Sequence, residues 1–529
     1  MLHVVAICPG PYSNHSGDPT LNPLADELDA QLWGLLPGFH RLMFDVGQVL
    51  LTLCIGDVAK SLRQQLFKAD SIEVNTAVVA ATDWIYTAKA LARLCKPGAL
   101  LTTSSSVMNK EFIEAALTQC GFVTEICGDF IKASYSAPWL AKKSNLAVVP
   151  STCVVVGAGL AGAAVANSLA RRGWAVTVLD EASTPASGAS SLPAGLLVPH
   201  TSVDDSALSR LSRAGVRITL QQARALLRHG TDWGQTGVLQ RQLDDDVPHL
   251  PLTWDTAHDA ASDWCYPASA RSLSAAGLPT DSRALWHAQA GWVKPAALVN
   301  GWLSATGTTW RGDAKVTQLT PDGDGWQVRD ASGKVLAQAD LVVISAGVAS
   351  QLLASAAGAA TPDLQAIRGQ VTFGLQKEGD KLPPFAVNGH GGLITAITTP
   401  EGPLWLMGAG YERDVHEPHI KAADHADNLL RLRTLLPQAA IALVEQFNPP
   451  QARGWAGIRC ATPNRLPVVS RLADISSSPG LWLCTGMGSR GLSFAALCGE
   501  LLAAQLHGEP LPIEGQLAGA IAGKKAKTD

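Results

Sequence analysis

Three glycines and one carboxylate have the types and spacing of a dinucleotide-binding site. The glycines are Gly157, Gly159 and Gly162, and Asp180 follows them at the distance that this fingerprint has. The first glycine permits a tight turn, the second lets the backbone approach a pyrophosphate, and the third lets a helix pack closely on a strand. Free N–H groups at the start of that helix attract phosphate, and the carboxylate accepts from ribose hydroxyls. Two serines in the loop after the carboxylate are expected to contact phosphate or ribose: Ser190 and Ser191.

A second glycine-rich turn, residues 485–492, lies near the end of the chain. A strand over Gly480–Cys484 leads into it and a helix over Ala495–Leu506 follows, so the helix N-terminus can face a bound flavin and stabilise its anionic reduced form. An enzyme that uses only NAD does not need this turn. The sequence therefore favours non-covalent FAD, although a plain strand-to-helix turn would have similar glycines. The turn residues that we expect at the cofactor are Gly486, Gly488, Ser489, Arg490, Gly491 and Leu492.

Patterns for metals and for nucleic acid are weak. His416 and His419 are close in sequence, but Pro418 interrupts the helix that a zinc site there would need, so we expect no metal. None of the 10 cysteines forms a C-x-x-C pair, which excludes a zinc ribbon. The net charge of −4 provides no overall cationic field for nucleic acid, although a local basic patch stays possible.

The start of the chain and its cysteines indicate a compartment. The first ten residues contain no basic region followed by a long apolar core, so we expect no signal peptide. Scattered thiols suit a reducing cytosol. The longest uncharged stretch ends at Arg171 and contains Pro150 and the glycines of the fingerprint, so we expect no membrane span and a cytoplasmic location.

A parallel sheet is needed to position these residues. Cys153–Val156 is a β-branched run typical of a buried parallel strand, and Trp174–Leu179 is the next strand, after a helix. Residues 339–347 form a further buried strand that ends in Ser-Ala-Gly. Hydrophobic residues make up 47% and charged residues 16% of the 529 residues, which is enough for a large core. The predicted fold class is α/β with a Rossmann-like domain.

Residues 1–149 show a more irregular α/β pattern. Lys96-Pro97-Gly98 is a turn signal that ends one of the expected helices. Strands are expected over Val49–Ile55, Ala99–Thr103 and Phe122–Ile126, and helices over Ala88–Leu94 and Glu111–Gln119.

Six motifs occur in order between residues 150 and 510: residues 157–162, 187–199, 291–295, 367–371, 458–467 and 485–492. With these motifs the chain resembles the MnmC-type bifunctional bacterial enzymes that modify the wobble uridine of tRNA. The C-terminal half of such enzymes belongs to the glycine oxidase and D-amino-acid oxidase group. The runs around Arg459 and Arg490 resemble the tRNA-modifying branch in particular.

The resemblance implies two domains and a reaction within residues 150–529. A Rossmann-like FAD-binding domain would comprise about 150–235, 295–360 and 450–510, and an antiparallel-sheet substrate domain of α+β type about 236–294 and 361–449. The reaction would oxidise the CH–NH group of 5-carboxymethylaminomethyl-(2-thio)uridine, with hydride transfer to the flavin. Hydrolysis of the imine would give 5-aminomethyl-(2-thio)uridine and glyoxylate. Wobble-modified tRNA would be the partner.

The resemblance also implies which residues touch the substrate. The arginine that matches Arg459 binds the substrate carboxylate in glycine oxidase-like enzymes, and a guanidinium fork suits a carboxylate better than lysine does. The alternative for Arg459 is a structural ion pair. Tyr411 follows Gly408-Ala-Gly410 and either lines the substrate pocket or packs in the core. Arg490 contacts the flavin O2 or RNA, or is structural.

The first half departs from the family pattern. In the family it is an S-adenosylmethionine-dependent methyltransferase, which residues 23–28, 35–42, 51–57 and 90–98 still resemble. The glycine-rich cofactor loop has no counterpart here, Cys8-Pro9-Gly10 stands where the ribose-binding acid is expected, and residues 71–82 lack the Asp-Gly-Phe-x-Pro segment of the methyl-transfer site. Asp57 alone could serve an adenine pocket. We therefore expect residues 1–149 to be a truncated Rossmann-like methyltransferase domain that does not bind S-adenosylmethionine.

Two other functions fit parts of the sequence. An FAD oxidase or dehydrogenase of free glycine, sarcosine or D-amino acids would have a very similar C-terminal half, but the methyltransferase-like first half favours tRNA. A non-catalytic tRNA-binding protein could keep FAD for its structure alone, but it would not need the intact glycine turns or Arg459.

Overall fold

The chain divides into two compact units. The first comprises residues 1–149 and 504–519, and the second comprises residues 150–503 and 520–529. The computed structural model describes residues 1–10, 22–75, 79, 83–104, 110–137, 148–243, 250–251, 254, 258–472 and 480–523. None of the helices in these ranges has the length and the apolar composition that crossing a bilayer requires.

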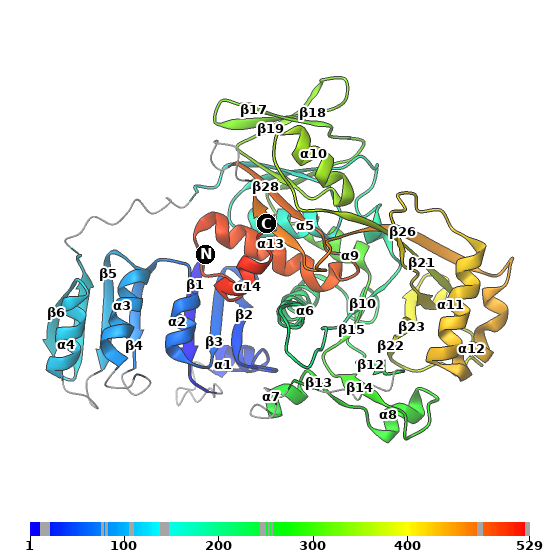
Figure 1. Cartoon of the computed structure of the whole chain (residues 1–529), viewed down its shortest axis with the longest axis horizontal. Helices are drawn as coiled ribbons and strands as arrows, with labels where there is room; N and C mark the ends of the chain where they lie inside the picture. The colour runs from blue at the N-terminus through cyan, green and yellow to red at the C-terminus, as the bar shows by residue number, and fades with distance from the viewer. Residues whose placement is uncertain are drawn as a thin grey trace, which may run out of the picture. The chain divides into compact units, whose positions relative to one another are not determined.

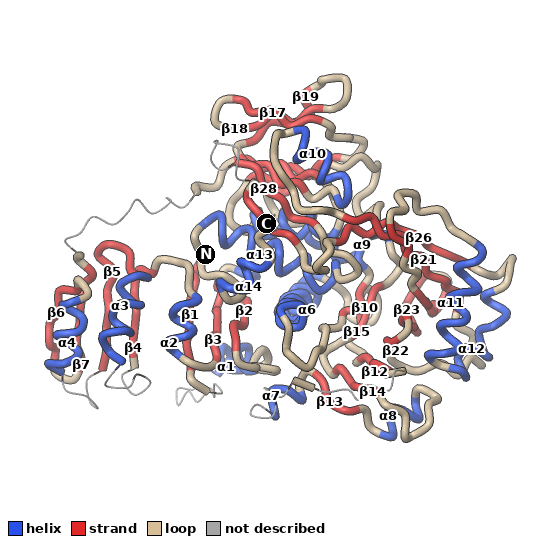
Figure 2. Tube along the Cα trace, viewed as in Figure 1, coloured by secondary structure: helices blue, strands red, loops and turns tan. Residues whose placement is uncertain are grey.

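In the described part of the first unit, the strands form two separate sheets (Figure 2). In one, β1 (Leu2–Cys8) pairs in parallel with β3 (Val49–Ile55), which pairs antiparallel with β2 (Gly38–Phe44). The other consists, in order, of β4 (Ala69–Val74), β5 (Cys95–Ser104), β7 (Phe130–Tyr135) and β6 (Phe122–Cys127). β1 and β4 are edge strands, and each pairs in parallel with one neighbour, β3 and β5. No described strand pairs with both β1 and β4.

Helices cover the sheets of the first unit through an apolar core. They are α2 (Val58–Gln64), α3 (Trp84–Leu94) and α4 (Lys110–Gln119), whereas the short helix α1 (Asn22–Asp29) contributes no residue to this core. Trp84, Leu91 and Ile113 are buried in this core together with Leu101 and Ile131 of the second sheet. The strands and helices predicted here occur in the observed order, but β2, β4, β7, α1 and α2 were not predicted.

One predicted turn in the first unit is placed differently. Residues 96–98 were expected to separate a helix from a strand, whereas they lie inside β5. The pairing with β4 jumps from Ala69–Cys95 to Ser71–Leu100, so residues 96–99 bulge out of the ladder. The Pro-Gly signal therefore marks a bulge in a strand that begins at Cys95. The segment predicted to lack a methyl-transfer motif, residues 71–82, lies partly outside the described residues.

Residues 504–519 were expected in the oxidoreductase part but belong to the first unit. The fully buried Arg41 donates a hydrogen bond to the carbonyl of Pro510, and the backbone N–H of Gln516 donates to Gln64 at 2.8 Å. These residues include the end of α13 (Gly491–His507) and most of α14 (Gly515–Ala520). The fold therefore builds the first unit from both ends of the chain.

The second unit is built on a mainly parallel sheet. Its strands, in order, are β16 (Thr308–Arg311), β9 (Ala175–Leu179), β8 (Thr152–Val156), β20 (Leu341–Ile344), β28 (Gly480–Thr485) and β27 (Val468–Arg471). All neighbours pair in parallel except β27 with β28. The middle strands are almost fully buried, as their β-branched sequences predicted. A separate sheet of β17 (Gln318–Asp322), β18 (Gly325–Arg329) and β19 (Val335–Ala339) lies beside α10 (Ser350–Ala356).

A larger mixed sheet forms the other part of the second unit. Its strands, in order, are β13 (Cys265–Pro267), β14 (Ala284–His287), β12 (Val238–Arg241), β22 (Ala386–Gly389), β23 (Gly391–Thr399), β24 (Gly402–Gly408), β21 (Gln365–Leu375) and β25 (Glu412–Arg413). Helices α11 (Ala422–Leu435) and α12 (Pro437–Leu443) cover one face of it (Figure 1). The sheet was expected to be antiparallel, and it is so except that β12 pairs in parallel with β22.

One strand of this sheet comes from a segment that was expected in the FAD-binding domain. β26 (Arg453–Ala461) pairs antiparallel with β21 along its whole length. The predicted piece 450–510 is therefore divided, and its first strand belongs to the substrate sheet. This strand carries Arg459, so the substrate sheet itself positions that residue.

Candidate active site

A cavity of about 1300 Å3 joins the fingerprint turn, the late glycine-rich turn and the substrate sheet. Gly157 and Gly159 line it from the first turn, Gly486 and Gly488 from the second, and Arg459 from the sheet. Segments that are far apart in sequence therefore meet in one place, all within the second unit.

The fingerprint turn has the shape of a phosphate cradle. Gly157 has a φ of +106°, and a Cβ on it would lie 2.5 Å from the carbonyl oxygen of Ser345. A Cβ at Gly162 would lie 1.8 Å from the carbonyl oxygen of Gly157, so helix α5 (Leu160–Ala170) packs against the turn only because a side chain is absent there. Both positions match the reason why this fingerprint needs glycine. The hydroxyl of Ser345 lines the cavity and is buried without a hydrogen-bond partner among the described residues, as a site for a polar ligand would leave it.

Asp180 stands where strand β9 ends and faces the cavity. One carboxylate oxygen accepts from the backbone N–H of Ala158 at 2.7 Å, and the other accepts from the N–H of Ala182 at 2.9 Å. These two bonds fix the carboxylate between the first turn and the loop after β9. Each oxygen keeps a further lone pair for a ribose hydroxyl.

The two predicted serines differ in placement. Ser190 is buried, lines the cavity and accepts a hydrogen bond from the first N–H of helix α5, at Leu160. Ser191 does not line the cavity: its hydroxyl donates to the carbonyl of Gly188 and accepts from the indole of Trp455 at 2.8 Å. A short 3-10 turn (Ala189–Ser191) thus directs the two side chains differently, and of the two serines only Ser190 faces the cavity where the cofactor was expected.

All six predicted residues of the late turn line the cavity, from Gly486 to Leu492. Gly486 and Gly488 have positive φ angles of 76° and 54°, and the N–H of Gly488 donates to the carbonyl of Cys460. Helix α13 starts at Gly491, so its N-terminal N–H groups and its dipole face this part of the cavity.

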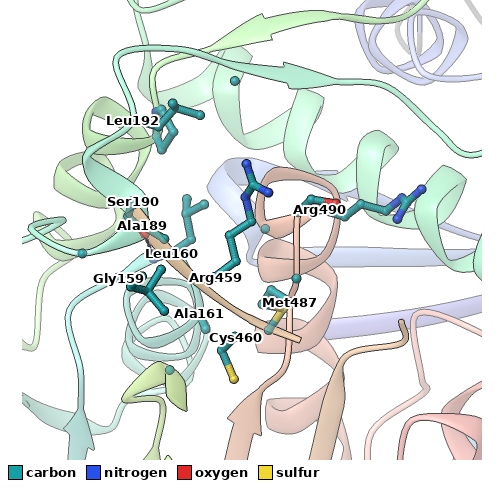
Figure 3. A pocket seen from close by; sticks show the side chains of 18 of the residues that line it. Gly159, Leu160, Ala161, Ala189, Ser190, Leu192, Arg459, Cys460, Met487 and Arg490 are labelled. Carbon is teal, nitrogen blue, oxygen red and sulfur yellow. Dashed lines mark hydrogen bonds between the residues drawn. The ribbon is translucent and has the colours of Figure 1, made fainter. Parts of the chain in front are cut away.

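Arg459 reaches from β26 into the cavity, between the loop with Ser190 and the turn with Met487 (Figure 3). Its guanidinium lies over Gly369 of β21, where a Cβ would come within 2.3 Å of a guanidinium nitrogen. It donates one hydrogen bond, to the carbonyl of Gly410 at 3.2 Å. Burial lowers the pKa of Arg459, but an arginine keeps its charge in proteins. A desolvated cation without a carboxylate partner among the described residues favours an anionic ligand.

Tyr411 and Arg490 border the same cavity near Arg459. Tyr411 is 53% exposed, so the alternative of a tyrosine packed in the core is ruled out. The side chain of Arg490 extends away from Arg459 (Figure 3). Burial and then the neighbouring Arg465 lower the pKa of Arg490, and burial together with these two arginines lowers the pKa of His200. This edge of the cavity is therefore cationic.

Several cavity residues were not predicted from the sequence. Gln240 and Asn388 line the cavity from neighbouring strands of the substrate sheet, and His200 lines it from the loop after β10 (Gly195–Leu197). The sequence signal for Gln240 and Asn388 as cavity residues was a polar residue that follows apolar residues within a strand. His416 lines the cavity too. In the ranges that the structure describes, no group of three or more His, Cys, Asp or Glu side chains could hold a metal ion. Asp57, considered for an adenine pocket, instead caps helix α2 by accepting from the N–H of Lys60.

Sequence comparison identifies relatives over nearly the whole chain. The family described as "FAD dependent oxidoreductase" (DAO) matches residues 152–505. The protein named "tRNA 5-methylaminomethyl-2-thiouridine biosynthesis bifunctional protein MnmC" of Polaromonas naphthalenivorans (strain CJ2) is 49% identical over 523 residues, which cover 95% of this chain and 81% of the relative. The protein of the same name from Delftia acidovorans is 45% identical, over 96% of this chain and 83% of the relative.

Solved structures are similar in fold. Glycine oxidase from Geobacillus kaustophilus is 19% identical with a TM-score of 0.56, over 71% of this chain and 98% of that protein. Iminodiacetate oxidase from Chelativorans sp. BNC1 is 20% identical with a TM-score of 0.51, over 68% and 96% of the two chains. These similarities establish the fold of the second unit. Together with the family match they support FAD as the cofactor for which the cavity has room.

Proposed function

The chain belongs to the FAD-dependent oxidoreductases and, among them, to the bifunctional MnmC proteins of tRNA wobble-uridine modification, and from this premise we propose its reaction. It oxidises the carboxymethylaminomethyl group of wobble 5-carboxymethylaminomethyl-(2-thio)uridine in tRNA. The products are the 5-aminomethyl nucleoside and glyoxylate. The single observation that carries the proposal is the desolvated Arg459, which shares one cavity with the dinucleotide cradle. A protein that acts on tRNA in this way would work in the cytoplasm.

Residues of both turns hold the FAD in this proposal. Gly157, Gly159 and the N-terminus of α5 bind the pyrophosphate, and Asp180 binds the adenosine ribose. The N-terminus of α13 and the residues from Gly486 to Leu492 face the isoalloxazine. Ser190 holds the start of α5 in place through its bond to Leu160. When bound, FAD supplies the acceptor for the hydride.

Arg459 and Tyr411 act on the substrate. Arg459 takes the carboxylate of the glycine-like unit in a bidentate pair, which fixes the methylene carbon in position. Tyr411 borders the same space and shields the carboxylate from water on the open side. The substrate reacts as a neutral amine in this proposal, so the reaction needs no strong base from the cavity. After hydride loss, water hydrolyses the imine and releases glyoxylate.

The first unit is an incomplete methyltransferase-like domain in this proposal. Doubly wound sheets have a central strand that pairs with both halves of the sheet. Here the parallel pairs β1–β3 and β4–β5 lie in separate sheets, and no described strand joins them. The described residues therefore contain no switch point between two halves of one sheet, and in this proposal the first unit does not bind S-adenosylmethionine.

Product analysis tests the proposed reaction. Flavin-replete protein is incubated with tRNA that carries 5-carboxymethylaminomethyl-uridine, and the nucleosides are then analysed by mass spectrometry. We expect the 5-aminomethyl nucleoside and an equal amount of glyoxylate, with no methylated product when S-adenosylmethionine is added. An unchanged nucleoside in the presence of full flavin would refute the oxidation, and a 5-methylaminomethyl product would refute the assignment of the first unit.

A further inference from the structure

A row of residues in register crosses the substrate sheet on its cavity side. Gln240 of β12 is opposite Asn388 of β22, which is opposite Gly392 of β23, which is opposite Gly408 of β24. The row continues through Val371 of β21 to Trp455 of β26. All six residues line the cavity. The row therefore has two amides at one end, two glycines in the middle and an indole at the other end.

The opposite face of the same strands is apolar. Leu239, Val387, Leu393 and Met407, each next in sequence to a member of the row, are buried in the core beneath α11 and α12. Side chains alternate between the two faces of a strand. The two amide side chains therefore point to the cavity face of the sheet. They take no part in the apolar packing on the opposite face.

Gln240 is held in one orientation by a buried histidine. The Nε2–H of His287 donates to Oε1 of Gln240 at 2.7 Å. His287 is fully buried, burial lowers its pKa to about 4, and its Nδ1 has no partner among the described residues. The ring is therefore neutral, and since the glutamine oxygen can only accept, the ring proton lies on Nε2. The NH2 group of Gln240 is left to donate elsewhere, and no described residue accepts from it.

The residues beside the amides give the cavity an apolar floor. Gly392 and Gly408 carry no side chains, and neighbouring apolar side chains fill the places where a Cβ would stand: Leu196 at 2.9 Å from the Gly392 position and Val371 at 2.7 Å from the Gly408 position. Asn388 is half-buried, and no described residue hydrogen-bonds to its side chain. A flat ring can therefore lie against this apolar floor of Leu196 and Val371 with one polar edge towards the two amides.

We propose that Gln240 and Asn388 recognise the pyrimidine edge of the substrate nucleoside. This inference rests on the proposed function and names the residues that give it base specificity. The uridine edge presents carbonyl acceptors on either side of an N–H donor, and the two amides supply NH2 donors and a carbonyl acceptor to match it. The amide edge lies at β12, at the end of the row away from Arg459 on β26, so carboxylate and base are held by different parts of the sheet. His287 is the positioning residue that directs Gln240.

Two substitutions test the recognition in the full-length holoenzyme. Gln240→Glu keeps the oxygen that accepts from His287 but removes the NH2 donor, and Asn388→Leu removes the polar groups but keeps the number and branching of the side-chain heavy atoms. Gln318→Glu, on an exposed strand position outside the cavity, is the control for the added negative charge. The measurements are flavin content, the limiting rate of anaerobic flavin reduction, and the concentration of tRNA with 5-carboxymethylaminomethyl-uridine that gives half of that rate.

The expected result is a shift in tRNA concentration dependence alone. Each cavity variant should need about tenfold more tRNA for half-maximal reduction, as expected for one lost hydrogen bond, with full flavin content. Gln318→Glu should match the wild type. Half-maximal concentrations within about twofold of the wild type in both cavity variants would overturn the inference, and so would a loss of flavin in both, which would assign the amides to the cofactor. If tRNA does not reduce the wild-type flavin, the proposed function itself fails and the inference falls with it.

Discussion

Arg459 combines a charge, burial and a lack of any described acidic partner. Its guanidinium is stacked over Gly369 and bonded to one carbonyl, so its remaining N–H groups are directed at the cavity. The sequence identified this residue through its resemblance to a family motif. The sequence alone could not show that the guanidinium lies over Gly369, because this contact depends on the register between β21 and β26.

Replacing Arg459 should affect substrate more than cofactor. In Arg459→Lys the single ammonium cannot reproduce the bidentate pair, so we expect kcat/KM for the modified tRNA to fall about a hundredfold, or roughly 3 kcal/mol. The flavin content should stay at the wild-type value. Steady-state kinetics with a flavin absorbance measurement checks both, and unchanged kinetics would remove Arg459 from the site.

His287 makes stability depend on pH. Its pKa is about 4 in the folded protein and about 6.5 when unfolded. Because the folded value is the lower one, the unfolded chain takes up the proton first, and stability is lost as pH falls from 6.5 towards 4. The loss approaches roughly 3 kcal/mol near pH 4.

Thermal unfolding at pH 7 and pH 4.5 measures this loss. The drop in melting temperature between the two pH values should be smaller in His287→Gln than in the wild type, since glutamine carries no titrating group. Equal drops in both proteins would mean that His287 is not buried in its neutral form.

At the scale of single elements, local patterns predicted the strand–turn–helix of the fingerprint because its function depends on a contiguous segment. The same reasoning misassigned β26, since the sheet that a strand joins is decided by its partners and not by its own residues. Sequence patterns could not separate Ser190 from Ser191 for a similar reason: a three-residue turn decides which of two adjacent serines faces the cavity. Strand β7 was missed because the residues that flank its hairpin carry no strong turn signal other than Gly128.

The contact between α5 and the first turn gives a sharp test of the fingerprint. In Gly162→Ala the new methyl group would lie 1.8 Å from the carbonyl oxygen of Gly157, so the helix must move away from the turn. We expect most of the flavin to be lost on purification, as measured by the ratio of absorbance at 450 nm to that at 280 nm. The matched control is Gly379→Ala in an exposed loop with open space around it. Full flavin occupancy in Gly162→Ala would show that the turn does not hold the cofactor.

At the scale of the whole molecule, the first unit depends on residues from the far end of the chain. Sequence patterns indicate local elements, and nothing local marks residues 504–519 as part of the first unit. The link is made by buried groups such as Arg41, whose side chain bonds to the carbonyl of Pro510.

Arg41→Met should therefore destabilise the first unit selectively. The methionine keeps an unbranched apolar stem but leaves the carbonyl of Pro510 without this donor, at a cost of about 1–3 kcal/mol. Hydrogen exchange should become faster in β1 and β3, while flavin release on heating should be unchanged. Arg63→Met, at an exposed position of α2, is the control. Hydrogen exchange at the wild-type rate in β1 and β3 would mean that the bond between Arg41 and the C-terminal segment does not stabilise the first unit.

We propose that the cavity oxidises a glycine-like unit carried by tRNA. Anaerobic reduction of the bound flavin tests it most directly, with tRNA that carries 5-carboxymethylaminomethyl-uridine in one sample and free glycine in another. We predict loss of the flavin absorbance with the tRNA at low concentration and little or no loss with glycine. Bleaching by glycine or another free amino acid alone would contradict the account and place the protein among the oxidases of small amines.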